Sequence, residues 1–287
     1  MNSVLAADLG GTKILAACVH ADGRCAEPVR RSTPAAQGAA AVVEALAEAL
    51  QAARQAAPGE DLRAIGLSLA GVIDRHSARV LDATDALPGW KGTDLRAALQ
   101  DRLGLPVFAL NDVHAALRGE AWRGGLQGAE RGALITLGTG LGGAWLAEGQ
   151  LQTGAHQLAG HFGRTQVLHE GRRVPLEELV SGSALARWHG AAPDGHAVLA
   201  TLDSDPRSRD ALRRWTEQLA LLLHNLHWSL DPGRVLIGGG LIEARALWWD
   251  GLLHELRGLP LQVEPAQLGA LAGLYGAARE ALDGVRA

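Results

Sequence analysis

Cysteine is scarce in this chain of 287 residues, which contains only Cys18 and Cys25. Two cysteines seven positions apart make neither a disulfide framework nor a familiar zinc-binding spacing. Runs of about 18 uninterrupted apolar residues, which a transmembrane helix needs, are also missing. The first residues, MNSVLAADLGG, include no basic leader, and Asp8 interrupts their apolar run. We therefore expect an unprocessed cytoplasmic protein without a membrane partner.

An excess of positive charge is missing too, since 27 lysines and arginines face 31 aspartates and glutamates. Proteins that bind nucleic acid usually carry a strongly basic face, so small molecules are the expected partners and nucleic acid is not. The hydrophobic content is 47%, which supplies real cores. At roughly 100 to 200 residues per domain, the length allows two domains.

Apolar runs alternate with glycine-rich turns and predict an α/β fold. Residues 3–7 and 14–20 flank the turn DLGGT, and this pattern predicts a β-hairpin. Residues 132–151 repeat it. Apolar residues recur at three and four positions in residues 37–56, which indicates an amphipathic helix. Further helices are expected at about 113–124, 176–190, 208–230 and 272–287, and further strands at 62–71, 105–110 and 234–237. The last of these strands is expected to lead through the turn GGG into another helix.

The repeated hairpin unit predicts a duplicated architecture. We expect an N-terminal α/β lobe of residues 1–112 that is completed by a C-terminal helix at about 272–287. The C-terminal α/β lobe is expected to span residues 113–271. The C-terminal helix has small residues at spacings that favour close packing.

Three glycine-rich turns, DLGGTK, LGTGLGG and GGG, are candidate phosphate-binding sites. Successive backbone N–H groups in such a turn form an anion-binding concavity. None has the spacing of a Walker A loop or of a dinucleotide-binding fingerprint. Tight hairpin turns explain any single one of them equally well. The candidate nucleotide contacts are Asp8, Gly10, Gly11, Thr12, Lys13, Gly138, Thr139, Gly140, Gly142, Gly239 and Gly240.

Two further positions combine acidic chemistry with a strand end. Asp8 ends its strand beside a glycine turn, where a carboxylate can hold Mg²⁺ through water. Asn111 and Asp112 follow the predicted strand 105–110 and precede a predicted helix. Asp112 is therefore a candidate base. Asn and Asp are also the preferred N-caps of helices, so a purely structural role stays open.

The motifs DLGGTK, ALNDVHAA, LGTGLGG, VSGSAL, DPGRVLIGGGL and GLYGAA resemble, in order and spacing, the ROK (repressor/ORF/kinase) family of sugar kinases. The resemblance covers nearly the whole chain. It implies a two-lobed, actin-like or hexokinase-like ATPase fold, built as a duplicated ribonuclease H-like unit. It also implies ATP and Mg²⁺ as cofactors, a hexose as substrate, and commonly a homodimer. By the same resemblance Asp112 is the catalytic base and Asn111 contacts the sugar.

The resemblance extends to other residues on the sugar side. Gly71 occupies the family's sugar-side turn, although a plain turn glycine is an equal explanation. Trp90 lies in a loop that resembles one bordering the sugar cleft. Ala86 replaces an asparagine often found there, which puts one sugar contact in doubt. Glu177 stands where the family has a sugar-contacting glutamate, and it also suits the first turn of a helix.

The segment LAGHFGRTQVLHEGRRVPLEEL, residues 158–179, departs from the family pattern. Many relatives have AGE-x-GH followed by cysteines that bind a structural zinc. Here His161 replaces the glutamate, Arg164 replaces a zinc-ligand histidine, and the cysteines are missing. Arginine stays protonated and has no acceptor, so no structural zinc is expected. We expect ion pairs of Arg164, Arg172 and Arg173 with Glu170, Glu177 and Glu178.

The exchange at His161 resembles the bacterial N-acetylmannosamine kinases. We therefore predict an ATP- and Mg²⁺-dependent kinase that phosphorylates the 6-hydroxyl of N-acetylmannosamine. Glucose and N-acetylglucosamine are the alternative substrates. Repressors of the family carry a helix-turn-helix segment ahead of the first glycine motif, for which we expect no room here. A non-catalytic sugar sensor stays open, although Asp8, Asn111, Asp112 and Glu177 favour the enzyme.

Overall fold

The computed structural model describes residues 2–84 and 87–286. The chain divides into two compact units. Unit 1 joins Met1–Gln127, Thr153–Leu158 and Gln267–Ala287, and unit 2 joins Gly128–Gln152 and Ala159–Ala266. The predicted division into lobes, with a boundary at residue 112, stays a prediction.

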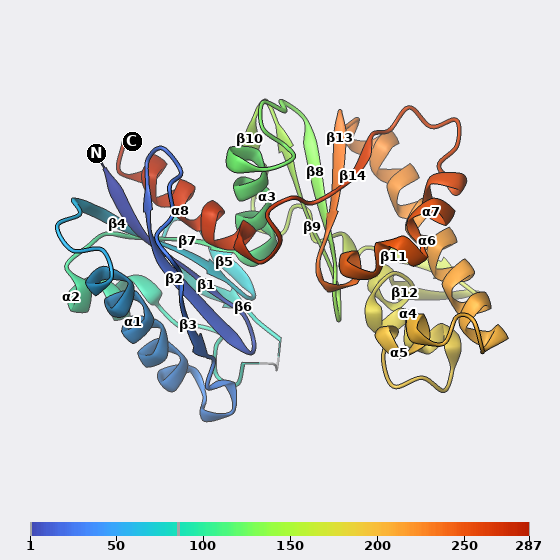
Figure 1. Ribbon diagram of the computed structural model, residues 1–287, viewed down its shortest axis with the longest axis horizontal. Coiled ribbons are helices and arrows are strands. Elements are labelled where there is room, and N and C mark those ends of the chain that lie inside the picture. The colour runs from blue at the N-terminus through green and yellow to red at the C-terminus, as the bar shows by residue number, and fades with distance from the viewer. Residues whose placement is uncertain (1, 85–86, 287) are drawn as a thin grey trace. The chain divides into compact units, whose positions relative to one another are not determined.

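Unit 1 is built on a five-stranded sheet with the order β3-β2-β1-β4-β7 (Figure 1). Its strands are β1 Ser3–Leu9, β2 Lys13–His20, β3 Val29–Ser32, β4 Leu62–Leu69 and β7 Val107–Asn111. β1, β2 and β3 are antiparallel neighbours, whereas β4 and β7 run parallel to β1. A separate small hairpin pairs β5 Val72–Asp74 with β6 Arg79–Asp82. The antiparallel pairing of β1 with β2 confirms the hairpin predicted around DLGGT.

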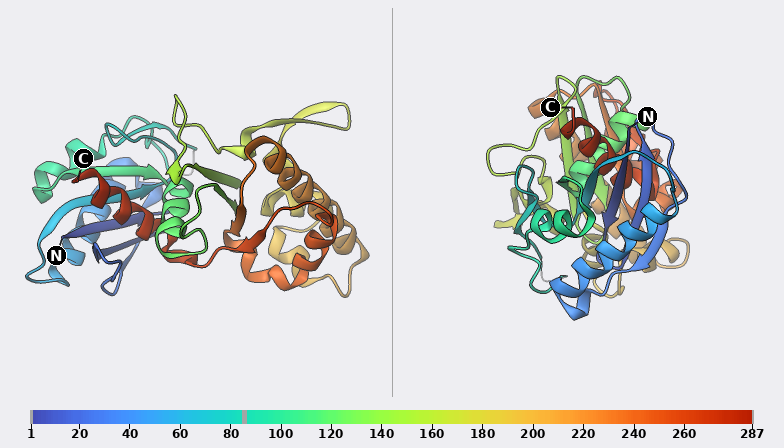
Figure 2. Two further views of the ribbon diagram at one scale, coloured as in Figure 1. Left: turned by 90° about the horizontal axis from the view of Figure 1, so that it is seen from above. Right: turned by 90° about the vertical axis from the view of Figure 1, so that its left-hand side faces the viewer.

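Helices cover both faces of this sheet. They are α1 Ala39–Gln55, α2 Leu95–Leu103, α3 Asp112–Arg123 and α8 Ala272–Gly284. α1 buries Val42, Leu46 and Leu50, which are spaced by four residues along one face of an amphipathic helix, in one core with the strands. α8 lies on the opposite face with α3, as Figure 2 shows. A Cβ on Gly276 would lie 1.6 Å from the carbonyl oxygen of Ala115, so small residues permit this close packing.

Unit 2 repeats the strand order of unit 1, as β10-β9-β8-β13-β14. Its strands are β8 Gly132–Leu137, β9 Leu141–Ala147, β10 Gln150–Leu151, β13 Arg234–Gly238 and β14 Val263–Pro265. β8, β9 and β10 are antiparallel, and β13 and β14 run parallel to β8. The same order and directions in both sheets confirm the predicted duplicated α/β fold.

The helices of unit 2 bury a second core against β8 and β13. They are α4 Gly182–His189, α5 Gly195–Ala200, α6 Pro206–Leu230 and α7 Trp249–Glu255. α6 confirms the helix expected at 208–230, and Asp205 caps it through a hydrogen bond from the amide of Arg207. Within residues 2–84 and 87–286, no helix is both long and apolar enough to cross a membrane.

Two predicted helices differ from the structure. The helix expected at 176–190 is interrupted: a short 3₁₀ turn, η3 Leu176–Glu178, precedes α4. Ser181 has an extended backbone between them, and its hydroxyl accepts a hydrogen bond from the amide of Ala184, which starts a new helix. The turn GGG leads into a kinked 3₁₀ segment, η4 Gly240–Leu247, and not directly into an α-helix.

Candidate active site

The carboxyl ends of β1, β4 and β7 lie side by side in unit 1. The register pairs Asp8 with Ser68 and Leu69 with Asn111. Gly71 lies two residues after the end of β4, and Asp112 follows β7 directly. Parallel strands deliver the residues that follow them to one edge of a sheet, where ligands of α/β proteins commonly bind. The fold thus brings the predicted residues Asp8, Gly71, Asn111 and Asp112 to one edge of the first sheet.

Asp8 is held tightly at this edge. The hydroxyl of Ser68 donates a hydrogen bond of 2.5 Å to its Oδ1. A Cβ on Gly273 of α8 would lie 2.6 Å from the same oxygen, so a glycine lets α8 approach the carboxylate. Burial raises the pKa of Asp8, while the bond from Ser68 and the charge of Lys13 oppose that rise. A cation at this carboxylate would favour its ionised form.

The turn after Asp8 contains four of the predicted nucleotide contacts, Gly10 to Lys13. The amide of Gly10 donates to the carbonyl of Lys13 at 2.9 Å, which closes the hairpin. The hydroxyl of Thr33 donates to the carbonyl of Gly10 at 2.7 Å. Gly11, Thr12 and Lys13 are solvent-exposed, so their polar groups are accessible to a ligand.

Asn111 is both a helix cap and a fixed anchor. Its Oδ1 accepts hydrogen bonds from the amides of Val113 at 3.0 Å and His114 at 3.2 Å, so the capping role is confirmed. Its Nδ2 donates to the carbonyl of Gly71 at 2.8 Å and to Asp112 Oδ1 at 2.7 Å. Because Asn111 caps the helix, Asp112 is not needed as the cap.

Gly71 fixes the acceptor that Asn111 uses. Its φ of +106° is one that side-chain-bearing residues rarely adopt, and a Cβ there would lie 2.6 Å from the carbonyl oxygen of Asp82. Glycine is therefore required by the backbone at this position.

Asp112 carries the most informative electrostatics of the site. Solvent reaches the residue, yet protein atoms surround it closely enough that burial is the largest cause that raises its pKa, to about 6. The hydrogen bond from the amide of Val113 opposes the rise, and the nearby charge of Asp8 adds to it. The group is therefore mostly ionised at pH 7 but remains basic enough to accept a proton.

Trp90, whose loop resembles one that borders the sugar cleft, is fully buried. Its Nε1 donates to the carbonyl of Ala70 at 3.0 Å, directly before Gly71. The ring thus packs in the core and supports the turn, and it has no free face for stacking on a ligand. Ala86, the predicted site of a missing sugar contact, lies outside the described residues.

The glycine turns of unit 2 meet the start of α4. The amide of Gly138 donates to the carbonyl of Gly140 at 3.1 Å, and the amide of Gly182 donates to the carbonyl of Gly138 at 2.7 Å. The hydroxyl of Ser183 donates to the carbonyl of Thr139 at 2.9 Å. The VSGSAL segment therefore joins the nucleotide candidates, a role that its helix N-terminus could have signalled in the sequence.

A cavity of about 850 Å³ opens at this meeting point within unit 2. Its lining includes Gly138, Thr139, Gly182, Ser183, Arg187 and Gly240. Gly239 shapes the turn behind it, since its φ is +86° and a Cβ would lie 2.4 Å from the carbonyl oxygen of Leu137. Gly142 lies inside β9, paired with Thr136. Backbone groups and a helix N-terminus thus surround a space of ligand size.

The segment that departs from the family pattern forms a hairpin. β11 Gln166–His169 pairs with β12 Arg172–Pro175, after a 3₁₀ turn η2 Phe162–Arg164. His161 is partly buried directly before this turn. Phe162 packs on β9, where a Cβ on Gly143 would lie 2.2 Å from the phenyl ring. Glu177 also lies near the glycine turn, since a Cβ on Gly140 would be 3.2 Å from its Oε2.

The ion pairs predicted for this segment are largely wrong. In the part of the chain that the structure describes, no ion pair joins Arg172 or Arg173 to Glu170, Glu177 or Glu178. Backbone pairing and packing order the segment instead, because cross-strand hydrogen bonds do not depend on exposed charges.

Comparisons with known proteins agree with this geometry. Residues 4–283 match the sequence profile of the ROK family. The chain is 32% identical to an N-acetylmannosamine kinase of Escherichia fergusonii, over 96% of this chain and 97% of that protein. It superposes on a ROK hexokinase from Thermus thermophilus with a TM-score of 0.88 and 32% identity, covering 99% of both chains.

A second solved structure is a ROK family glucokinase from Streptomyces griseus in complex with glucose and AMPPNP. It matches with a TM-score of 0.81 and 30% identity, covering 98% of this chain and 99% of that one. The two structures confirm the predicted hexokinase-like fold.

Proposed function

The chain belongs to the ROK family, and from this premise we propose that it is a kinase that transfers the γ-phosphoryl group of ATP to a sugar hydroxyl. The observation that carries the proposal is the pair Asn111 and Asp112 at the end of β7. Phosphoryl transfer needs a residue that orients the attacking hydroxyl and accepts its proton. Asp112, with a pKa of about 6, suits that role.

Asn111 is proposed to position the base. Both hydrogens of its Nδ2 have acceptors, Gly71 and Asp112, and its Oδ1 accepts two amides. A direct contact between Asn111 and the sugar would require exchange of one of these bonds. The arrangement fixes Asp112 Oδ1, and preorganisation of this kind lowers the cost of reaching the reactive geometry.

The nucleotide is proposed to bind in the cavity of unit 2. Its backbone groups and helix N-terminus suit phosphate oxygens. The AMPPNP complex of the Streptomyces griseus glucokinase supports ATP as the donor. Mg²⁺ is proposed to bind near Asp8 through water, because hard cations prefer oxygen ligands. When bound, Mg²⁺ would neutralise phosphate charge.

The preferred acceptor is proposed to be the 6-hydroxyl of N-acetylmannosamine. His161 supports it, since imidazole both donates and accepts hydrogen bonds and suits an acetamido group. The relative from Escherichia fergusonii supports the same substrate. Glucose is the second candidate, because the glucokinase is almost equally similar.

The assembly is proposed to be a homodimer in the cytoplasm. Leu221 and Trp228 of α6 are 51% and 73% exposed and lie two helical turns apart on one face. Exposed apolar residues of this size are typical of protein interfaces. Light scattering after gel filtration should give twice the chain mass of 30.0 kDa; a monomer at micromolar concentration would contradict the proposal.

The function is tested by ADP release with MgATP over N-acetylmannosamine, N-acetylglucosamine, glucose, fructose and allose. We expect kcat/KM for N-acetylmannosamine to exceed that for glucose by roughly tenfold or more, as one recognised polar substituent allows. A reversed preference would leave the kinase proposal intact and remove the assignment of the sugar. If every sugar fails while the folded chain binds one of them, the sensor hypothesis replaces the kinase.

A further inference from the structure

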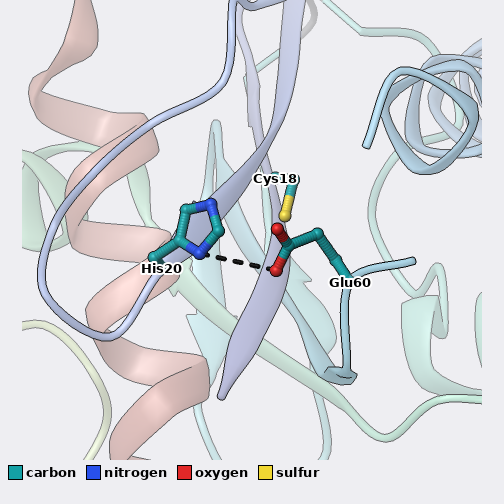
Figure 3. A group of neighbouring side chains, drawn as sticks. All are labelled: Cys18, His20 and Glu60. Atoms are coloured by element: carbon teal, nitrogen blue, oxygen red, sulfur yellow. Dashed lines mark ion pairs between the residues drawn. The ribbon is translucent and has the colours of Figure 1, made fainter. Parts of the chain in front are cut away.

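Three side chains with metal-ligating atoms gather in unit 1, at the end of β1 opposite to Asp8. Cys18 and His20 belong to β2, and Glu60 precedes β4 (Figure 3). Their ligand atoms, a thiol sulfur, an imidazole nitrogen and a carboxylate oxygen, lie within 4.8 Å of one another. His20 Nδ1 is 3.5 Å from Glu60 Oε2.

The fold explains why these residues meet. Cys18 and His20 are two positions apart on one strand, so they share a face of the sheet. Ser3 pairs with His20 across the hairpin, and its hydroxyl donates to Glu60 Oε2 at 2.8 Å. The same hydroxyl lies 3.1 Å from His20 Nδ1. Ser3 is fully buried, so it orients the carboxylate from a fixed position.

We propose that Cys18, His20 and Glu60 bind one divalent transition-metal cation, for which Zn²⁺ is the best match. Thiolate, imidazole and carboxylate are the three ligand types that proteins use for zinc. Zinc bonds of about 2.0–2.3 Å place tetrahedral ligand atoms about 3.3–3.8 Å apart. The cluster therefore needs to close by only about 1 Å, and a fourth position is left for water.

Charge favours the cation as well. A thiolate and a carboxylate together neutralise a divalent ion, which removes most of the penalty of burying charge. Burial and then the charge of Glu60 raise the pKa of the Cys18 thiol, and a cation beside the sulfur would favour the thiolate. The side chains of His20 and Glu60 are 14% and 31% exposed, which gives an ion a route in.

A hydrogen-bonded cluster that fixes the start of β1 is the simpler interpretation. It accounts for Ser3, His20 and Glu60, and Cys18 joins it through a hydrogen bond with Ser3. The cation proposal goes further, because it gives the thiol, imidazole and carboxylate atoms that face one another a common role. The site is also separate from the proposed kinase chemistry, because Asp8 lies five residues along β1 from Ser3, roughly 17 Å at the rise of a strand.

Cobalt spectroscopy on the full chain tests the site. After treatment with a chelator, we expect one equivalent of Co²⁺ to produce the near-ultraviolet charge-transfer band of a cobalt thiolate, and Zn²⁺ to displace it. Cys18→Ser should abolish the band. Cys25→Ser is the matched control, because the Cys25 thiol instead donates to the carbonyl of Ala26, and it should retain the band.

Zinc affinity, measured by competition with a chromophoric chelator, provides a second readout that does not rely on the cobalt–thiolate band. Glu60→Gln, at a partly exposed side chain, should weaken Zn²⁺ binding by at least as much as Ser3→Ala. For Ser3→Ala we expect a loss of roughly 10- to 100-fold, as is usual when a residue that orients a ligand is removed. Unchanged affinity in Glu60→Gln, or no thiolate band in the unmodified chain, would overturn the site.

Discussion

Both sheets have the same strand order and directions, but their carboxyl edges carry different chemistry. At the edge of the first sheet, the side chains of Asp8, Asn111 and Asp112 supply charge and hydrogen-bonding groups. At the edge of the second sheet, Gly138 and Gly240 supply backbone and space. One scaffold thus provides a carboxylate site in one unit and a glycine-lined cavity of about 850 Å³ in the other, because the residues after each strand and not the sheet itself decide the chemistry.

The largest effect is expected from Asp112→Asn in the first unit. The amide oxygen can still accept from the amide of Val113, so the fold should persist, whereas the proton acceptor is lost. We expect kcat to fall by roughly 10² to 10⁴ with KM for ATP little changed. Steady-state ADP release measures both.

Asp101→Asn is the matched control, since Asp101 is an exposed aspartate in α2 of the same unit, and it should keep full activity. Near-normal turnover of a folded Asp112→Asn protein would remove Asp112 from the mechanism.

An intermediate effect is expected from pH. The base must be ionised, and the pKa of Asp112 is raised to about 6. The ionised fraction therefore falls as pH drops through about 6, and kcat/KM for the sugar should fall about tenfold per unit below it. Rates measured between pH 4.5 and 8 give the midpoint and slope of this fall in kcat/KM. Circular dichroism at each pH confirms that the protein stays folded. A midpoint near 4, the ordinary value for an aspartate, would show that the surroundings do not perturb this group.

The smallest effect is expected in the second unit, from Gly240→Val. A Cβ at Gly240 would meet no atom within 4 Å, so the side chain should extend into the cavity without disturbing the fold. We expect KM for ATP to rise roughly tenfold, the size of about 1.4 kcal/mol of lost binding. KM for the sugar should stay nearly constant.

Gly251→Ala serves as control, because Gly251 is exposed in α7 and a Cβ there would make an ordinary contact of 3.7 Å with Thr216. If Gly240→Val raised the sugar KM and left the ATP KM unchanged, the roles given to the two sheets would be wrong.

Local patterns in the sequence predicted the strand ends that carry the candidate residues. Apolar runs stopped by DLGGT or by Asn111 and Asp112 mark a strand boundary wherever the chain folds. The sequence did not predict the break before α4, because helix propensity in PLEELV outweighs the weak signal of one capping serine. It also did not predict the burial of Trp90, because that depends on packing between segments.

The sequence by itself determined the duplicated pattern of hairpins and the glycine turns, since both arise from the order of neighbouring residues. Only the tertiary structure decided that Asn111 donates to the carbonyl of Gly71, and that Ser183 joins the turn at Thr139. It also decided that Cys18 and His20 meet Glu60, some forty residues farther along the chain. Sheet pairing brings such distant residues within bonding distance, and no local sequence pattern records that pairing.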